Sequence, residues 1–515
     1  MLQGAWPKAL LAATSAALLL FCFPLRDMGW LIWLAPAPLF ILVLHGRGRI
    51  GGWAYLCGLL WFLPLLGWMQ GFSELGWALA AAFCALFVAA FALAAHHLTR
   101  RLPAFWAPLV LASAWTVAEW LRCAGPLRFS WGQLAVSQYR YPTVLQMLDW
   151  TGSFGLTWLI ALVAASVAAL FSARTYVAGG RWLFVSLWLL GLLSMRGHWV
   201  LQRAAQDRTP VTRVAVVQAS GSSYRGISVR IDSPWARYAQ LTRREATREA
   251  QLVIWPETAV VEDLVHDEEA RQRTGALAAE IGADLLSGSF VHDADAPKPA
   301  NSAVLFGRDG VVRGRYDKVN LVPFGEYLPL RSVTERFVPD DAIPYDLTAG
   351  KVFEPIPWRK GKVGVVICFE SAFPGPTRRL TREGSNLLAI ITSDTWPGKQ
   401  AAGRQHLAFA PLRAVESRRS MARAAATGVS ALIDPYGRVL DRLEADERGS
   451  LSNRLPLRQD RTFYVIVGDW PVGLSVLLLL AALAAVLLRG DVRGDVRERP
   501  RRRQAPSPKR ARSSS

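Results

Sequence analysis

The chain has 515 residues, which is too long for one ordinary domain, and it carries a formal net charge of +19 with 52% hydrophobic and 19% charged residues. The apolar residues are concentrated in about the first two hundred residues and near the C-terminus, which argues against a wholly soluble protein. Four of the five cysteines lie in or just after apolar segments, and only Cys368 lies in the middle block, which excludes a disulfide framework or a zinc-like cysteine cluster there.

Eight apolar segments are predicted to cross a bilayer, because a spanning helix needs about 20 mostly apolar residues. They cover residues 8–24, 28–45, 52–70, 74–95, 104–121, 154–172, 181–196 and 469–488. The first has Lys8 ahead of its apolar run, as a signal peptide would, but no small-residue cleavage site follows it. We therefore interpret it as a helix of the mature protein.

Basic residues in the short loops predict the orientation of these segments. With the N-terminus in the cytoplasm, the short outer loops carry only Arg26, and the inner loops carry the larger set. That inner set comprises Lys8, Arg47, Arg49, Arg100, Arg101, Arg174 and Arg181. Seven crossings then place the middle block outside the cytoplasm, and the eighth returns the C-terminal tail to it.

The longer loop at 122–153 is not apolar enough to span a membrane, although it contains Trp131 and Trp150. Two interpretations remain open: an ordinary interfacial loop, or a surface segment that shapes the access of lipid to the middle block.

The middle block alternates β-like and helix-like segments, which is typical of a layered α/β domain. The predicted organisation is a membrane domain of seven helices at 1–211, a catalytic domain at 212–460, an eighth membrane helix at 461–489 and a basic disordered tail at 490–515. From Arg489 onward the chain has ten lysines and arginines against three acidic residues. Because this tail directly follows an apolar segment, we interpret its charge as a topology signal against anionic lipid and expect no nucleic-acid partner.

Three reactive side chains lie at the ends of β-like runs within the middle block: Glu257, Lys318 and Cys368. The runs are Val253–Trp255, Val311–Tyr316 and Val363–Ile367. Each residue alone has a structural explanation, as a turn-capping carboxylate, a surface lysine or a core thiol. Together, a carboxylate, an ammonium and a thiol can perform acyl transfer through a thioester.

The motifs around these residues resemble those of the nitrilase superfamily, which uses a Glu–Lys–Cys triad. They are Trp255-Pro256-Glu257, the Asp-Lys and Val-Pro-Phe-Gly-Glu-Tyr pattern within 317–327, and Cys368-Phe369-Glu370. With its apolar segments, the chain up to about residue 488 resembles the apolipoprotein N-acyltransferase family of the bacterial envelope. The resemblance implies a polytopic α-helical membrane domain plus an α/β nitrilase-like domain, an αββα sandwich.

The resemblance also implies roles for individual residues. Cys368 becomes the nucleophile, Glu257 the general base and Lys318 the group that stabilises the oxyanion. The supporting residues are Glu326, Phe369 and Glu370. No cofactor and no metal are implied. The family has a functional tryptophan on a mobile loop ahead of the base, but Trp235 does not fall in register with it, so we leave Trp235 out of the predicted site.

The implied reaction moves a fatty acyl chain from a phospholipid donor to the N-terminal amine of a diacylglyceryl-cysteine lipoprotein. It would take place at the bacterial inner membrane, with the catalytic domain in the periplasm and both termini in the cytoplasm. A lid loop that keeps water from the thioester is expected at 351–360 or 373–380.

Two other classes of function are alternatives. One is a membrane-anchored amidase that hydrolyses a small amide with the same triad. The other is a transporter or receptor with an outer ligand-binding domain, against which the few charges within the apolar segments argue weakly, Glu119 being the clearest.

Overall fold

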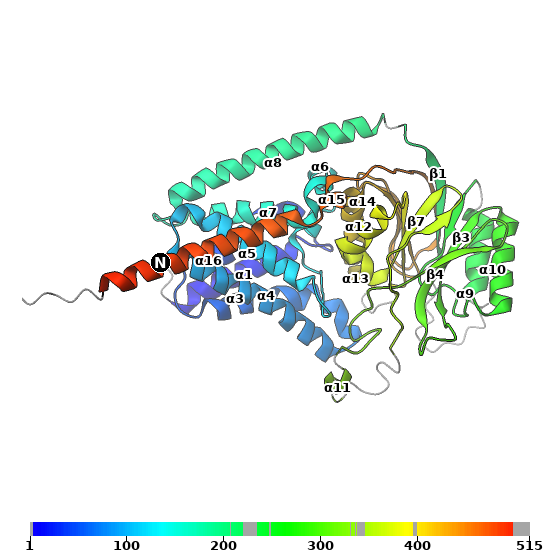
Figure 1. Cartoon of the computed structure of the whole chain (residues 1–515), viewed down its shortest axis with the longest axis horizontal. Helices are drawn as coiled ribbons and strands as arrows, with labels where there is room; N and C mark the ends of the chain where they lie inside the picture. Colours follow the sequence, from blue (N-terminus) through cyan, green and yellow to red (C-terminus); the bar gives the residue numbers. More distant parts are fainter. Residues whose placement is uncertain are drawn as a thin grey trace, which may run out of the picture.

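Apolar helices form one half of the molecule and two stacked β-sheets form the other (Figure 1). The computed structural model describes residues 4–206, 208–219, 234–246, 249–329, 331–334, 336, 346–394 and 399–497. The predicted tail therefore lies largely outside the described residues. The N-terminus and the far end of the last helix both lie at the end of the helical bundle remote from the sheets (Figure 1).

Each of the eight predicted apolar segments contains a helix. These are α1 (Ala5–Phe21), α2 (Ala37–His45), α3 (Ile50–Leu65), α4 (Glu74–Arg101), α5 (Ala107–Arg122), α7 (Leu148–Ala169), α8 (Tyr176–Ala204) and α16 (Trp470–Arg497). Within the described residues, five helical segments are long and apolar enough to cross a membrane, namely α4, the stretch Ala104–Arg122 that includes α5, α7, α8 and the part of α16 up to Leu488. The other three are shorter apolar helices, so the number of eight crossings stays a prediction.

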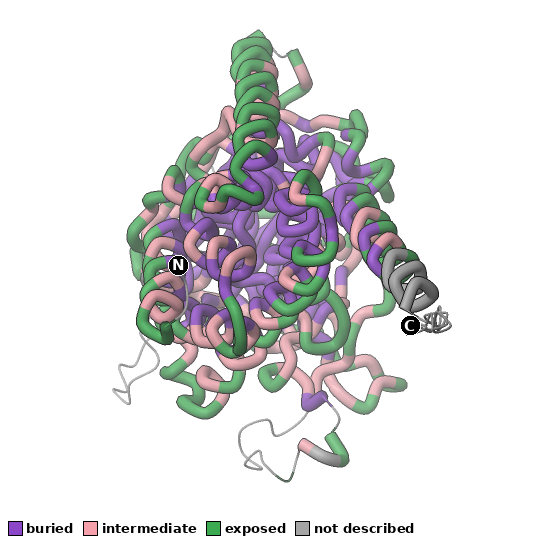
Figure 2. Tube along the Cα trace, turned by 90° about the vertical axis from the view of Figure 1, so that its left-hand side faces the viewer, coloured by how far each residue is buried: buried purple, intermediate pink, exposed green. Residues whose placement is uncertain are grey.

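The helical bundle has a buried centre and an exposed apolar exterior (Figure 2). On α8, for example, Phe184, Trp188 and Met195 are 71%, 60% and 70% exposed. A helix surface of this kind suits lipid, because apolar side chains facing water would lose the gain from burial.

Much of the loop at 122–153 is buried, which makes the interpretation as an ordinary interfacial loop wrong for those residues, while a role in the access of lipid stays a prediction. It forms the short helices η4 (Leu134–Gln138) and α6 (Pro142–Leu145), and Trp131 is 2% exposed. Trp150, by contrast, is 50% exposed. Trp131 instead packs between the membrane helices and the sheets, with its ring against Trp68 and Phe369.

Two six-stranded sheets form the block that is predicted to be the catalytic domain. The first has the order β12 (Arg448–Pro456), β1 (Val211–Ala219), β2 (Leu252–Ile254), β3 (Asp284–Val291), β4 (Ala300–Phe306), β5 (Val312–Asp317). The second has the order β11 (Val439–Leu443), β10 (Ser430–Ile433), β9 (Ser420–Ala425), β8 (Leu387–Thr392), β7 (Gly361–Ile367), β6 (Ile356–Trp358). The central strands β1–β2–β3 and β7–β8–β9 run parallel.

Helices cover the outer face of each sheet, which confirms the predicted αββα sandwich. On the first sheet these are α9 (Pro234–Leu241) and α10 (Glu268–Ile281), and on the second α12 (Pro374–Arg382) and α14 (Phe409–Ser417). Fully buried apolar side chains such as Val216, Val365 and Ile390 fill the space between the sheets. This matches the continuous apolar runs that strands buried on both faces require.

Two strands and one break between helices are not marked by a local sequence pattern. The break separates α13 (Lys399–Leu407) from α14, and after α14 Arg418 takes a left-handed conformation with φ of 49° before β9 begins. The polar edge strand β12 pairs with β1 across more than two hundred residues of sequence, and β6 is only three residues long. Neither has a local apolar pattern that marks a strand.

A buried ion-pair network joins the two domains. Asp149, in the first turn of α7, accepts bonds at 2.8 Å from Arg196 of α8 and from Arg418 after α14. Arg418 also donates to Gln146 Oε1 at 2.6 Å. One carboxylate therefore fixes the catalytic domain against two membrane-domain helices.

We expect Asp149→Asn to lower the free energy of unfolding by about 2–4 kcal/mol, because it leaves two largely buried guanidinium groups without their shared counter-charge. Thermal unfolding of the full chain in detergent measures this change. Asp309→Asn, which removes an exposed partner of Arg313, is the matched control and should leave the melting temperature unchanged. Equal melting temperatures for both variants would contradict the proposed role of Asp149.

Candidate active site

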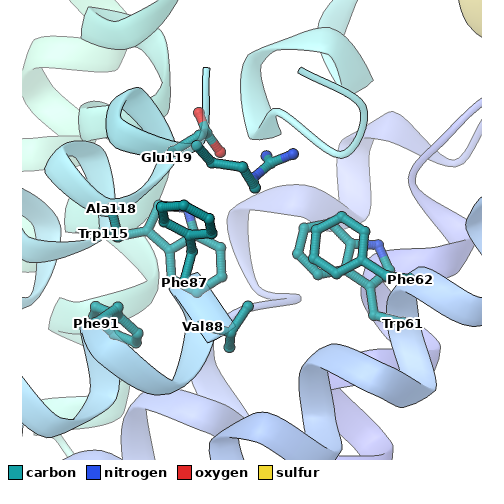
Figure 3. A pocket seen from close by; sticks show the side chains of 9 residues that line it. Trp61, Phe62, Phe87, Val88, Phe91, Trp115, Ala118 and Glu119 are labelled. Carbon is teal, nitrogen blue, oxygen red and sulfur yellow. The ribbon is translucent and has the colours of Figure 1, made fainter. Parts of the chain in front are cut away.

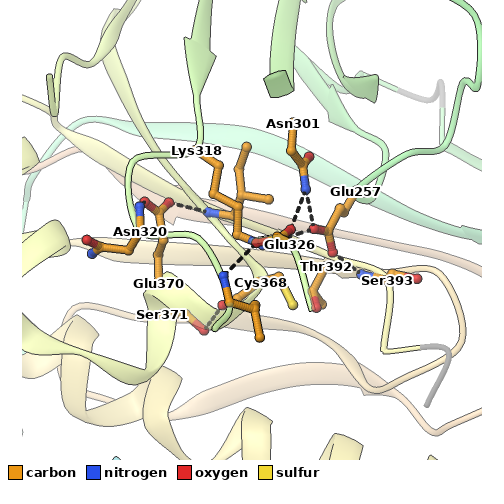
Figure 4. Close-up of polar contacts among 12 residues, drawn as sticks. Glu257, Asn301, Lys318, Asn320, Glu326, Cys368, Glu370, Ser371, Thr392 and Ser393 are labelled. Carbon is orange, nitrogen blue, oxygen red and sulfur yellow. Dashed lines mark hydrogen bonds and ion pairs between the residues drawn. The ribbon is translucent and has the colours of Figure 1, made fainter. Parts of the chain in front are cut away.

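The three predicted reactive residues meet at the seam between the two sheets (Figure 4). Glu257 lies three residues beyond β2, Lys318 directly follows β5, and Cys368 directly follows β7. The prediction that each lies at the end of a strand is confirmed. Their side chains converge because β2 and β5 belong to the first sheet and β7 to the second, and the sheets stack with these strand ends on one side.

Both carboxylate oxygens of Glu257 have polar partners in the site. Oε1 accepts a hydrogen bond from Asn301 Nδ2 at 2.8 Å and lies 3.4 Å from Lys318 Nζ, and Oε2 accepts from the Ser393 backbone N–H at 2.8 Å. The residue is 6% exposed. This carboxylate is therefore fixed in orientation and largely removed from water.

Lys318 is buried between two carboxylates. Its ammonium donates to Glu326 Oε1 at 2.7 Å and lies beside Glu257, and its side chain is 1% exposed. Burial disfavours the charged form, but Glu326 and Glu257 outweigh it and raise the pKa of Lys318 above its ordinary value. The lysine thus remains a cation in the site. Glu326 is itself fixed by the Val322 backbone N–H, which donates to Oε2 at 2.8 Å.

Cys368 forms a sharp turn between β7 and the short helix η6 (Cys368–Ala372). Its φ of 51° lies in the left-handed region, which costs a non-glycine residue of the order of 1 kcal/mol. Burial, and then the charge of Glu257, raise the pKa of the thiol well above its ordinary value, while Lys318 opposes them. The resting thiol is therefore protonated at neutral pH and needs a base when it attacks.

Glu370 stabilises the turn at Cys368 through hydrogen bonds to its side chain. Its carboxylate accepts hydrogen bonds from the backbone N–H groups of Ile367 and Asn320, both at 2.9 Å, and from the Tyr316 hydroxyl at 3.0 Å. Burial raises the pKa of Glu370 to about 7, and the backbone donors oppose that rise. The residue binds the end of β7 to the segment after Lys318, and so it orients two reactive groups at once.

A buried chain of polar residues beneath Cys368 was not predicted. The Ser371 hydroxyl lies 2.8 Å from both the Cys368 carbonyl oxygen and His406 Nε2. His406 Nδ1 lies 2.8 Å from Asp394 Oδ1, and Asp394 pairs with Arg423. Burial favours a neutral acid, but Arg423 outweighs it and lowers the pKa of Asp394, so this carboxylate accepts the Nδ1 hydrogen.

Aromatic rings connect the nucleophile turn to the membrane domain. Phe369 stacks on Trp131, with ring centroids 6.0 Å apart, and packs edge-on against Phe373 at 4.9 Å. A small pocket lies between α3, α4 and α5, lined mainly by Trp61, Phe62, Phe87, Val88, Phe91 and Trp115, with Glu119 at its edge (Figure 3). Phe62 and Trp61 reach toward the backbone at Gly132, next to Trp131. The apolar interior of the bundle is thus continuous with the turn.

Trp235 was left out of the predicted site, and the structure places it on α9, where it donates to Thr274 of α10 at 3.0 Å in the outer layer of the first sheet. The lid was expected to be a loop, but 374–382 form helix α12 and 356–358 form β6, so neither candidate segment is a loop throughout. The loop 221–234 ahead of Trp235 lies almost entirely outside the described residues.

This arrangement can support covalent catalysis at a carbonyl group, because it combines the thiol of Cys368, the carboxylate of Glu257 and the buried ammonium of Lys318. Among the described residues, no group of three histidine, cysteine or acidic side chains could hold a metal ion. Sequence reasoning missed Asn301, Ser393 and His406. These residues lie on β4, directly after β8 and on α13, which are far apart in the sequence.

Two family models match this chain. The model of the carbon-nitrogen hydrolase family matches residues 213–460, and that of the apolipoprotein N-acyltransferase N-terminal domain matches residues 15–166. The apolipoprotein N-acyltransferase of Geobacter metallireducens is 30% identical over 485 residues, which cover 89% of this chain and 91% of the relative. That of Pseudomonas syringae pv. tomato is also 30% identical, over 93% of this chain and 97% of the relative.

Two solved structures each match about half of this chain. A carbon-nitrogen hydrolase from Helicobacter pylori G27 is 17% identical, with a TM-score of 0.37, and the match covers 51% of this chain and 95% of the hydrolase. An amidase from Nesterenkonia sp. is 21% identical, with a TM-score of 0.38, and the match covers 52% of this chain and 97% of the amidase.

The raised pKa of Cys368 predicts slow alkylation at neutral pH. The rate with iodoacetamide, measured by mass spectrometry of the Cys368 peptide, should rise about tenfold per pH unit between pH 7 and 9, because only the thiolate reacts. Glu257→Gln should increase the rate at pH 8, since the charge of Glu257 raises the pKa of the thiol. A pH-independent rate, or slower alkylation of this variant, would contradict the assigned electrostatics.

Proposed function

The chain belongs to the apolipoprotein N-acyltransferase family, and from that premise we propose that it transfers a fatty acyl chain from a membrane phospholipid to the N-terminal amine of a diacylglyceryl-cysteine lipoprotein. The transfer proceeds through a thioester on Cys368. The observation that carries the proposal is the convergence of Glu257, Lys318 and Cys368 in a buried site whose nucleophile turn packs on the membrane domain.

The first half of the reaction forms the acyl-enzyme. Cys368 Sγ attacks the ester carbonyl of the phospholipid while Glu257 accepts the thiol proton, as the raised pKa of the thiol requires. The buried Lys318 ammonium stabilises the oxyanion of the tetrahedral intermediate, an effect worth several kcal/mol in a buried site. The C–O bond breaks, Glu257 returns the proton to the glycerol oxygen, and lysophospholipid leaves.

The second half transfers the acyl chain to nitrogen. The α-amine of the lipoprotein attacks the thioester carbonyl, Lys318 again stabilises the oxyanion, and Glu257 accepts a proton from the amine. The C–S bond breaks, and the thiolate of Cys368 recovers a proton from Glu257. The products are an amide and the free enzyme, and the step is favourable because an amide is more stable than a thioester.

The membrane domain supports lipid substrates. Each buried methylene stabilises by about 0.8 kcal/mol, so an acyl chain stays in an apolar environment while its ester reaches Cys368. The aromatic pocket of α3, α4 and α5 is the site proposed for that chain; its free volume of about 20 Å³ requires side chains to move first.

The proposed location is the bacterial inner membrane, with the catalytic domain in the periplasm. Two contacts between basic segments support this orientation, because they bring segments with predicted cytoplasmic charges side by side. Lys8 Nζ donates to the Arg47 carbonyl at 2.7 Å, and Arg174 donates to the Arg100 carbonyl at 3.3 Å. The N-terminus, close to Lys8, lies at the end of the bundle that is remote from the sheets (Figure 1). Both termini are then cytoplasmic.

The central experiment is intact mass spectrometry of the purified full chain after incubation with phospholipid. We expect a fatty-acyl adduct on Cys368 that hydroxylamine removes and that a diacylglyceryl-cysteine peptide accepts. Cys368→Ala should give no adduct. If the adduct is hydrolysed and the acyl chain never reaches the peptide, the result would favour a membrane-anchored amidase instead. Active protein without any adduct would exclude both the acyltransferase and the amidase.

Glu257→Gln should lower the rate of adduct formation by at least about 100-fold, because it removes the base from the attacking step. The same variant is expected to speed alkylation by iodoacetamide, so loss of acylation with faster alkylation separates a missing base from a misfolded site. Glu383→Gln, an exposed change at the end of α12, is the control and should acylate normally. Normal acylation of Glu257→Gln would remove Glu257 from its role.

A further inference from the structure

We propose that a cavity between the two domains binds the phosphate of the phospholipid donor, an inference that rests on the function proposed above. The cavity has a volume of about 170 Å³ and lies apart from the aromatic pocket of α3, α4 and α5. The end of α5, the start of α7, the start of α12 and the residue before α16 contribute to its wall. The residues that carry the inference are Arg128, Asn320, Phe353, Arg379 and Asp469.

Two guanidinium groups from different domains line this cavity. Arg128, from the segment after α5, donates to the Gly125 carbonyl at 3.0 Å and to Asn320 Oδ1 at 2.8 Å. Arg379, on α12, lies over the Phe353 ring at 5.2 Å. Within the described part of the chain, neither forms an ion pair with a carboxylate. Arginine presents a planar set of donors that matches phosphate oxygens, so the pair suits a phosphate ligand.

The charge of the cavity matches a phosphodiester. Asp469 also lines it and accepts a hydrogen bond from the Tyr464 hydroxyl at 3.1 Å. Two arginines and one aspartate leave a net charge of one positive unit, since 2 − 1 = 1. A phosphodiester carries one negative charge, so its binding would neutralise the cavity.

The position of the cavity favours a lipid over a soluble phosphate ester. Its wall includes Trp120 at the end of α5 and Phe154 near the start of α7, and the first residue of α16, Trp470, is 38% exposed. Tryptophan side chains at the ends of apolar helices lie at the level of lipid headgroups. A phosphate at this level belongs to a molecule whose tails remain among the helices.

The cavity adjoins the nucleophile turn. Asn320 accepts from Arg128 through its side chain, and its backbone N–H donates to Glu370 at 2.9 Å. Phe373 lines the cavity and packs against Phe369, the neighbour of Cys368. Phe373 and Phe369 therefore connect the phosphate site to the residue beside the thiol, which suits a headgroup and an ester that belong to the same lipid.

The test measures binding without turnover. Full-length protein with Cys368→Ala is titrated in detergent with phosphatidylglycerol, or with diacylglycerol of the same acyl chains, and bound lipid is counted by native mass spectrometry. Arg379→Gln should weaken phosphatidylglycerol binding about tenfold, which corresponds to roughly 1.4 kcal/mol, and leave diacylglycerol binding unchanged. Among the described residues the Arg379 side chain has no hydrogen-bond partner that its loss would disturb, so the variant should fold.

Two further variants sharpen the result. Arg379→Lys keeps the charge and should bind phosphatidylglycerol more tightly than Arg379→Gln. Arg382→Gln removes an equal charge from an exposed position about one turn further along α12, outside the cavity, and should bind like the parent protein. Arg128→Gln should repeat the loss seen with Arg379→Gln.

Equal phosphatidylglycerol binding by Arg379→Gln and its parent would overturn the phosphate site, as would an equal loss of diacylglycerol binding. Displacement of the lipid by millimolar glycerol phosphate would show that a soluble ester is the ligand and would overturn the lipid assignment. The proposed function fails separately, through the absence of an acyl adduct on Cys368 in the wild-type chain.

Discussion

A buried ammonium between two carboxylates is the interaction on which the site depends. Lys318 comes from the end of β5, Glu257 from the end of β2 and Glu326 from the turn that follows Lys318. A buried charge without a partner is destabilising by several kcal/mol, so these groups hold one another in place. Asn301 donates to both carboxylates and completes the arrangement. Lys318 and Glu257 therefore both stabilise the junction of the two sheets and take part in the proposed reaction.

The second constraint is the shared core of the two domains. Phe369, Phe373, Phe409 and Leu412 of the catalytic domain belong to the same buried cluster as the interior of the helical bundle. The nucleophile turn therefore rests on the membrane domain rather than on a flexible linker. In the proposed reaction, this contact would let the buried site of the α/β domain accept a substrate whose acyl chains remain in an apolar environment. The apolar pocket and the cavity proposed for the phosphate both lie near this turn.

Local sequence predicted the strands that carry the reactive residues, because runs rich in β-branched, aromatic or apolar residues precede Glu257, Lys318 and Cys368. It did not predict His406, Asp394 or Asn301 as neighbours of the site. Asn301 lies 44 residues from Glu257 and His406 lies 38 residues from Cys368, and no spacing rule connects a residue on α13 with the carbonyl of Cys368. Polar β12 was missed for the same reason, since its partner β1 is remote in sequence.

The sequence by itself determined the apolar segments, the α/β block, the three reactive residues and the family that their motifs resemble. These depend on composition and short patterns, which neighbouring residues fix. Only the tertiary structure decided that the segment around Trp131 is buried, that two sheets bring the three strand ends together, and that Arg128 and Arg379 face one cavity. Those features arise from packing between distant segments, and packing depends on shapes and burial that a linear pattern does not contain.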